Sequence, residues 1–116
     1  MSYFTPNLKL KTAEEIKNEL DTLSEVLAEK VYQYRLLEEN KKILLSQLTV
    51  GEQAKNNCSV AQAEKIAMSS EKYKLHIQAY CVAEQQYSKA KFDYANMNSY
   101  IDYLRTYISA QKSLMN

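Results

Sequence analysis

The chain has 116 residues, of which 46% are hydrophobic and 25% are charged, and its formal net charge is +1. This length allows one domain at most. A single glycine and a single proline are too few for the turns of a β-sandwich or barrel, so the composition predicts an all-α protein. The near-neutral charge gives no overall field that would draw the protein to nucleic acid or to a membrane.

The opening residues 1–11 predict a flexible N-terminal tail, because Pro6 resists helix formation. These residues lack the apolar core of a signal peptide. No apolar run in the chain approaches the ~20 residues that cross a bilayer. We therefore expect no membrane contact and a cytoplasmic protein.

A first long helix is predicted over residues 12–50. Thr12 and Glu15 have the spacing of a capping box, in which each satisfies part of the first helical turn. Lys30 and Lys41 interrupt the apolar stripe that follows, but long lysine stems can lie along apolar surface. Gly51, the one glycine, is placed where a left-handed residue would end the helix. The apolar residues that recur at intervals of three and four are Ile16, Leu20, Leu23, Leu27, Tyr34, Leu37, Leu44 and Leu48.

The second half of the chain predicts a polar loop at 51–58, a short helix at 59–68 and a long helix at 70–114. Ser59 and Gln62 form a second candidate capping box. Two serines, Ser69 and Ser70, either break the helical run or are carried through it, and the pattern does not decide between these. From Ser70 onward no glycine or proline stops a helix. Residues 12–116 are thus expected to form a single helical domain.

A ladder of tyrosines organises the last helix. Tyr73, Tyr80, Tyr87 and Tyr94 recur every seven residues, and a second row at the same period contains Ala83. A heptad repeat of this length favours a left-handed coiled coil. Two long helices joined by a short loop make an antiparallel hairpin, and such a thin hairpin buries only one side of each helix. We therefore expect a coiled-coil-like bundle that is completed by oligomerisation.

Chemistry that needs a catalytic or metal centre finds little support. His76 is the only histidine, and a packing or surface role is the simpler interpretation. Cys58 and Cys81 form no CxxC pair and have no histidine at metal-ligand spacing, so both are expected to be reduced. We expect no enzyme activity, no cofactor and no metal.

The tyrosines are the better candidates for binding. Tyr73, Tyr80, Tyr87 and Tyr94 favour core or interface anchors over rings that stack on bases, since tyrosine can bury its ring and keep its hydroxyl wet. A second cluster suits either a protein interface or single-stranded nucleic acid. It consists of Tyr100, Tyr103 and Tyr107, close in sequence to Arg105.

A local excess of basic residues lies between residues 55 and 91. Such an excess can track a phosphate backbone, especially if an oligomer multiplies it, although an ordinary solvated helix face explains it as well. The excess sets Lys55, Lys65, Lys72, Lys74, Lys89 and Lys91 against Glu64, Glu71 and Glu84.

Three segments together resemble a known family. They are EENKKILLSQLTVGE, SVAQAEKIAMSSEKYKLHIQAY and YLRTYISAQK, and their layout over residues 35–112 is similar to that of small helical phage proteins, including the UvsY-like recombination mediators. The resemblance implies an oligomer that binds single-stranded DNA in the bacterial host cytoplasm and has a recombinase and a single-strand-binding protein as partners. Such mediators are basic just after the Lys41–Lys42 pair, whereas residues 46–49 here are uncharged.

Two functional hypotheses follow. In the first, which the resemblance favours, the protein is a phage-type accessory factor of DNA recombination that helps to load a recombinase. Its nucleic-acid-binding residues would be Lys41, Lys42, Lys55, Lys72, Lys74, Lys89, Lys91 and Arg105. In the second, which the neutral charge favours, it is an oligomeric helical adaptor, assembly factor or inhibitor that acts only through protein contacts. Its interface residues would be Tyr73, Tyr80, Tyr87, Tyr94, Tyr100, Tyr103 and Tyr107.

Overall fold

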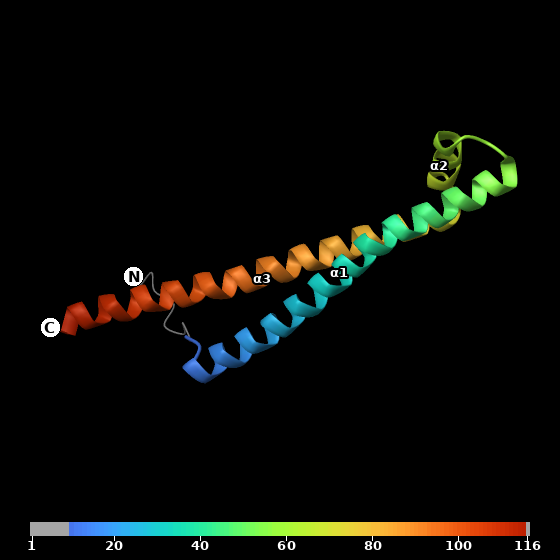
Figure 1. The fold of residues 1–116 in the computed structure, drawn as a ribbon. Coiled ribbons are helices and arrows are strands. Elements are labelled where there is room, and N and C mark those ends of the chain that lie inside the picture. The colour runs from blue at the N-terminus through green and yellow to red at the C-terminus, as the bar shows by residue number, and fades with distance from the viewer. Residues whose placement is uncertain (1–9, 116) are drawn as a thin grey trace.

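The computed structural model describes residues 10–115 and is all-α over that range, as predicted (Figure 1). Helix α1 runs over Ala13–Asn56, α2 over Val60–Met68 and α3 over Glu71–Met115. The molecule measures 82 × 30 × 19 Å, with a radius of gyration of 24.6 Å. A compact domain of this length would have a radius of gyration of about 13 Å. The chain is therefore a rod rather than a globule.

The two predicted helix starts are confirmed. The backbone N–H of Glu15 donates to the Thr12 hydroxyl at 3.1 Å, and that hydroxyl donates to the Glu15 carboxylate at 3.2 Å. At α2, the backbone N–H of Gln62 donates to the Ser59 hydroxyl at 3.3 Å. Each cap satisfies an N–H group that the first helical turn leaves without an intrahelical partner.

The predicted end of the first helix is wrong. The helix passes through Gly51 and ends at Asn56, so the predicted loop at 51–58 is helical over most of its length. The left-handed residue that ends it is Asn57, with φ 48° and ψ 47°, whose N–H donates to the Gln53 carbonyl at 2.9 Å. Asparagine tolerates this conformation better than other residues with a side chain, so the helix does not need its glycine as a stop.

Ser69 and Ser70 do break the second helical run. The hydroxyl of Ser70 donates to the Ala67 carbonyl at 2.7 Å and accepts the backbone N–H of Tyr73 at 3.2 Å. The Ser70 hydroxyl thus bonds to the last turn of α2 and caps the first turn of α3. The break allows α2 to fold against the end of α1, where Ala63 and Ala67 are buried (Figure 1).

Helices α1 and α3 form the predicted antiparallel hairpin, and the tyrosine ladder lies along the line where they meet, which we call the seam. Tyr73, Tyr80, Tyr87 and Tyr94 are half-buried, while Ala83 and Ala90 in the second row are buried. Small residues let the helices approach, and the rings fill the space beside them. The residues described contain just one large buried side chain, that of Leu104.

The predicted N-terminal tail is described only at its end, because residues 1–9 lie outside the described range. Leu10 and Lys11 are half-buried, not free. The backbone N–H of Lys11 donates to the Tyr100 hydroxyl at 3.0 Å, and its side chain pairs with Glu19. This contact sets the level at which α1 begins beside α3. The remaining part of α3, residues 101–115, continues for about 22 Å.

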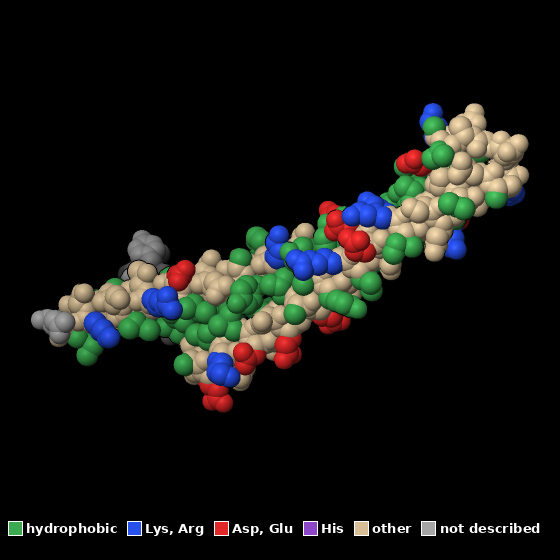
Figure 2. Space-filling model, in the orientation of Figure 1, with side chains coloured by type: hydrophobic (Ala, Val, Ile, Leu, Met, Phe, Trp, Pro, Cys, Tyr) green, Lys and Arg blue, Asp and Glu red, His purple; other side chains and the backbone are tan. Residues whose placement is uncertain are grey.

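The rod exposes far more surface than a compact protein. Its solvent-accessible area is 9126 Å², whereas a compact monomer of 13.5 kDa has about 6,500 Å². Figure 2 shows hydrophobic side chains gathered between α1 and α3, with basic and acidic side chains interspersed along the face in view. The hairpin alone therefore leaves a large area, part of it apolar, available for contact.

Candidate interaction surface

The middle of the seam is held by stacked aromatic rings. The Tyr34 ring of α1 lies between two rings of α3, with its centroid 5.4 Å from that of Tyr80 and 5.3 Å from that of Tyr87. The Tyr34 and Tyr80 hydroxyls lie 3.1 Å apart. This hydrogen bond raises the pKa of Tyr80 to about 12, and burial is the second cause of the shift. These rings are therefore engaged within the chain, and they position the two helices.

Polar seam residues also find partners inside the hairpin. His76 places its ring Nε2 2.9 Å from the Leu37 carbonyl, so the ring donates and its proton is on Nε2. The Lys41 ammonium lies over the Tyr80 ring, 4.8 Å from its centroid, in cation–π geometry. His76 is thus the packing residue that the sequence suggested, and Lys41 belongs to the seam.

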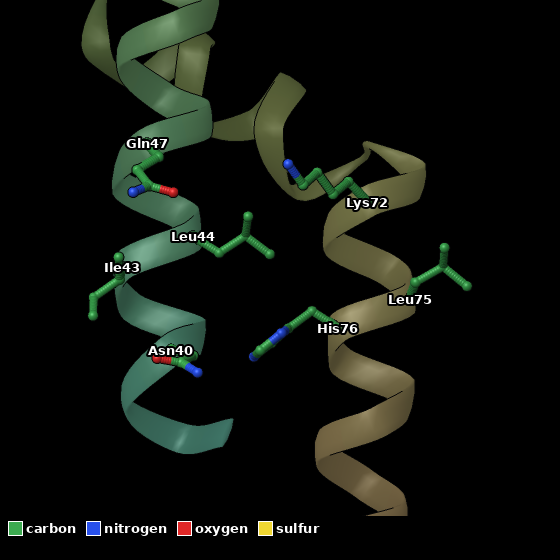
Figure 3. A pocket seen from close by; sticks show the side chains of 7 residues that line it. All are labelled: Asn40, Ile43, Leu44, Gln47, Lys72, Leu75 and His76. Atoms are coloured by element: carbon green, nitrogen blue, oxygen red, sulfur yellow. The ribbon is translucent and has the colours of Figure 1, made fainter. Parts of the chain in front are cut away.

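A groove of about 530 Å³ opens beside His76 on one side of the hairpin. Figure 3 shows Leu44 and His76 pointing toward one another from the two helices, and Ile43 and Leu75 pointing away from the gap. The other lining residues are Asn40, Gln47 and Lys72. The groove carries mixed polar and apolar chemistry and no cluster of titratable groups, so it offers no catalytic arrangement.

The structure does not bring the predicted DNA-binding lysines and arginine together. From Lys72 to Arg105 they extend over about 50 Å of α3, and Lys55 lies at the far end of α1. At 100° per residue, Lys72 and Lys74 project from different sides of the helix, and so do Lys89 and Lys91. No single stripe of positive charge results.

Five of these eight basic residues have partners in the chain. Lys41 lies over Tyr80, and Lys91 lies over the Tyr87 ring at 5.0 Å. The other three form exposed ion pairs, which contribute little to stability: Lys42 with Glu39 at 3.7 Å, Lys89 with Asp93 at 2.8 Å and Arg105 with Asp102 at 3.9 Å.

The last four turns of α3 carry a different surface, which we call the tyrosine face: Tyr100, Tyr103, Tyr107, Ile108, Leu114 and Met115. The ring centroids of Tyr100 and Tyr103 are 6.5 Å apart, and those of Tyr103 and Tyr107 are 6.4 Å apart. Toward the end of α3 the side chains become strongly exposed. The exposed fractions are Tyr103 50%, Tyr107 37%, Ile108 51%, Leu114 81% and Met115 85%.

The side of the tyrosine face around Tyr107 carries no charge, and only its edge at Ile108 approaches a charged residue, Lys112, about 40° around the helix. Asp102, Arg105 and Lys112 lie about 140–160° around the helix from Tyr107. The sequence proximity of Arg105 to the tyrosines therefore does not become contact: Arg105 pairs with Asp102 instead. An exposed, uncharged aromatic surface of this kind is typical of an interaction site.

The remaining candidates are metal sites, membrane-spanning helices and cysteines of the described residues. Within residues 10–115, no three His, Cys, Asp or Glu side chains are grouped so that they could hold a metal ion. Over the same range, no helix combines the length and apolar character that a membrane crossing requires. Cys58, in the connection after α1, and Cys81, on α3, are free thiols.

The chain was compared with known protein families, curated proteins and solved structures. No protein-family model, curated protein or solved structure matches the chain.

Reasoning from the sequence missed an exposed apolar stripe on α1 and did not foresee how far the end of α3 is exposed. Leu36, Ile43 and Val50 of α1 are all exposed, and their interval of seven was a signal that could have revealed a second stripe outside the seam. The exposure of Ile108, Leu114 and Met115 could not be foreseen, because it depends on where α1 begins relative to α3.

Proposed function

We propose that the protein is a non-enzymatic helical adaptor or assembly factor that works through protein–protein contacts, with the tyrosine face as its contact surface. The observation that carries this proposal is the exposure of Tyr103, Tyr107 and Leu114 on a helix side without charge. Tyrosine is enriched at interface hot spots because it offers a large, rigid and amphipathic contact area. A rod with few buried large side chains is also suited to joining other molecules.

The test is affinity capture with the full chain from a lysate of the cells that carry it. Tyr103→Ala and Tyr107→Ala should lose a specific bound protein and keep the helical circular dichroism of the wild type. Tyr32→Ala is the matched control, because Tyr32 is an exposed tyrosine on α1, far along the sequence from this face. If all three variants retain the same bound proteins as the wild type, the tyrosine face is not a contact surface and the proposal fails.

A second candidate is binding of single-stranded DNA by an accessory protein of recombination, the function implied by the resemblance to UvsY-like mediators. What supports it is the ladder of Tyr100, Tyr103 and Tyr107, with rings 6.5 and 6.4 Å apart. Rings at such intervals, of which those of Tyr103 and Tyr107 are exposed, suit sequence-tolerant stacking of bases. Against it stands the dispersal of the basic residues around the rod.

Fluorescence anisotropy with a labelled oligonucleotide separates the two candidates. DNA binding through phosphates should weaken steeply between low and moderate salt, because each contact releases condensed counterions. Tyr103→Ala should weaken it further at either salt concentration. An absence of binding at low salt eliminates this candidate and leaves the adaptor hypothesis untouched.

A further inference from the structure

The tyrosine face begins at the level of α3 where α1 starts, so α1 does not run alongside it. Helix α1 starts at Ala13, and the contact between Lys11 and Tyr100 places that start beside the beginning of the face. The apolar rows of the seam nevertheless continue along α3, through Ile101, Leu104 and Ile108. Figure 1 shows the end of α3 extending past the start of α1. Along these rows Leu104 is still buried, and Ile108 is the first member that is exposed. Tyr107 flanks the rows, about 60° around the helix from Leu104.

We infer that a second copy of this chain covers the tyrosine face, so that two α3 helices pair antiparallel about a two-fold axis at Tyr107. This inference rests on the proposed function and names its partner. A two-fold interface uses the same patch on both copies and must therefore be complementary to itself. Tyr100 and Leu114 are each seven residues from Tyr107, so each Tyr100 lies opposite the partner's Leu114.

The charged residues of this segment do not face the proposed axis. Asp102 and Lys112 are each five residues from Tyr107, on either side of it. Antiparallel pairing about Tyr107 brings each Asp102 level with the partner's Lys112, but both side chains project about 140° around the helix from Tyr107 and so lie outside the contact. The tyrosine face itself contributes no charge that burial would have to desolvate.

The area reaches the size of a specific pair only if all the exposed side chains of the face are fully buried. Side chains of this size bury roughly 150–250 Å² each, so the exposed fractions of Tyr103, Tyr107, Ile108, Leu114 and Met115 correspond to roughly 600 Å² per copy. Two copies would remove about 1,200 Å² from water, which is the lower end of the size of specific stable interfaces. The pair should accordingly be concentration-dependent.

The first experiment is light scattering on the full chain over a range of concentrations. The wild type should approach twice 13.5 kDa as concentration rises. Tyr107→Lys should remain at the mass of one chain, because two ammonium groups would meet at the axis, and Leu114→Lys should do the same. Tyr107→Phe and Tyr32→Lys, a matched exposed control on α1, should dimerise like the wild type.

The second experiment tests the axis itself. With Cys58 and Cys81 replaced by serine, Tyr107→Cys should form an interchain disulfide in oxidising buffer, because the axis brings residue 107 next to its own copy. Tyr103→Cys should not, since it lies opposite the partner's Gln111. Bridging at 103 but not at 107 would overturn the proposed register.

Three further results would overturn the proposal. One is a wild type that stays at single-chain mass, and another is a dimer that persists in Tyr107→Lys. The third is a monomer that dimerises only after residues 1–9 are deleted, which would assign the face to that segment of the same chain. If a monomer still loses a captured protein on Tyr107→Ala, the proposed function stands and only the identity of the partner is wrong.

Discussion

The hydroxyl of Tyr34 on α1 lies 3.1 Å from the hydroxyl of Tyr80 on α3, and their ring centroids are 5.4 Å apart. The two residues are 46 positions apart in sequence, so this contact records the register of the hairpin. It also favours this alignment of the two helices, because a shifted register would lose the hydrogen bond and the contact between the rings.

The Tyr34–Tyr80 pair should make stability depend on pH in the alkaline range. Because the pKa of Tyr80 is raised to about 12 from 10.0, the folded state favours the neutral phenol. The stabilisation is fully present below pH 10 and is lost as pH rises through 12. The melting temperature of the wild type should exceed that of Tyr34→Phe at neutral pH, and the difference should shrink between pH 10 and 12.

Thermal unfolding of the two proteins, followed by circular dichroism in matched buffers, measures this difference. Tyr32→Phe is the control, because Tyr32 is an exposed tyrosine two positions away. If the difference in melting temperature between wild type and Tyr34→Phe stays constant up to pH 12, the hydrogen bond does not hold the Tyr80 proton.

Close approach of α1 and α3 requires a small residue at position 90. Ala90→Leu should destabilise the hairpin by about 1–3 kcal/mol, since extra methylene groups would force the helices apart or the side chain out of its rotamer. Ala90 is buried, whereas Ala95→Leu on the exposed side should change stability by less than about 0.5 kcal/mol. Urea unfolding compares the two, and equal effects would mean that the helices are not in contact at Ala90.

Gly51 lies inside α1, where glycine is unfavourable. A Cβ built at this position meets no atom within 4 Å, so Gly51→Ala has room for its methyl group. The substitution should raise the free energy of unfolding by about 0.5–1 kcal/mol, because alanine loses less backbone entropy in a helix. Urea unfolding would contradict the helical assignment if the variant were less stable than the wild type.

The left-handed residue after α1 gives the complementary test. Asn57 has φ 48°, so Asn57→Ala should cost about 1–2 kcal/mol. Asn57→Gly should be neutral or slightly stabilising, because glycine adopts this conformation without steric cost. Asn56→Ala, one position earlier and helical, is the control. The end assigned to α1 would be wrong if Asn57→Ala and Asn57→Gly had equal stability.

The sequence was sufficient for the parts of the fold that depend on local chemistry. Thr12 and Ser59 were recognisable caps, and the seven-residue spacing from Tyr73 to Tyr94 identified the seam. The end of α1 was not recognisable, because Gly51 and Asn57 can both adopt the left-handed conformation and the local pattern favoured glycine. The choice between them depends on packing, since continuing through Gly51 gives α2 more of α1 to pack against.

In the candidate site, too, the sequence predicted what depends on local chemistry and not what depends on packing. The clustering of Tyr103 and Tyr107 in the sequence predicts binding residues, and the structure adds that both are exposed. Arg105 is close to this cluster in sequence, but 100° per residue directs its side chain to the other side of the helix from Tyr107. The availability of the tyrosine face was not predictable, since it follows from the offset between the start of α1 and the end of α3.

Small-angle X-ray scattering of the dimeric fraction tests most directly whether copies join end to end through the tyrosine face. Two rods of 82 Å that overlap over about 24 Å of α3 predict a longest dimension of about 140 Å. A dimer whose longest dimension stays near 82 Å would mean that the rods lie side by side, and it would contradict the account.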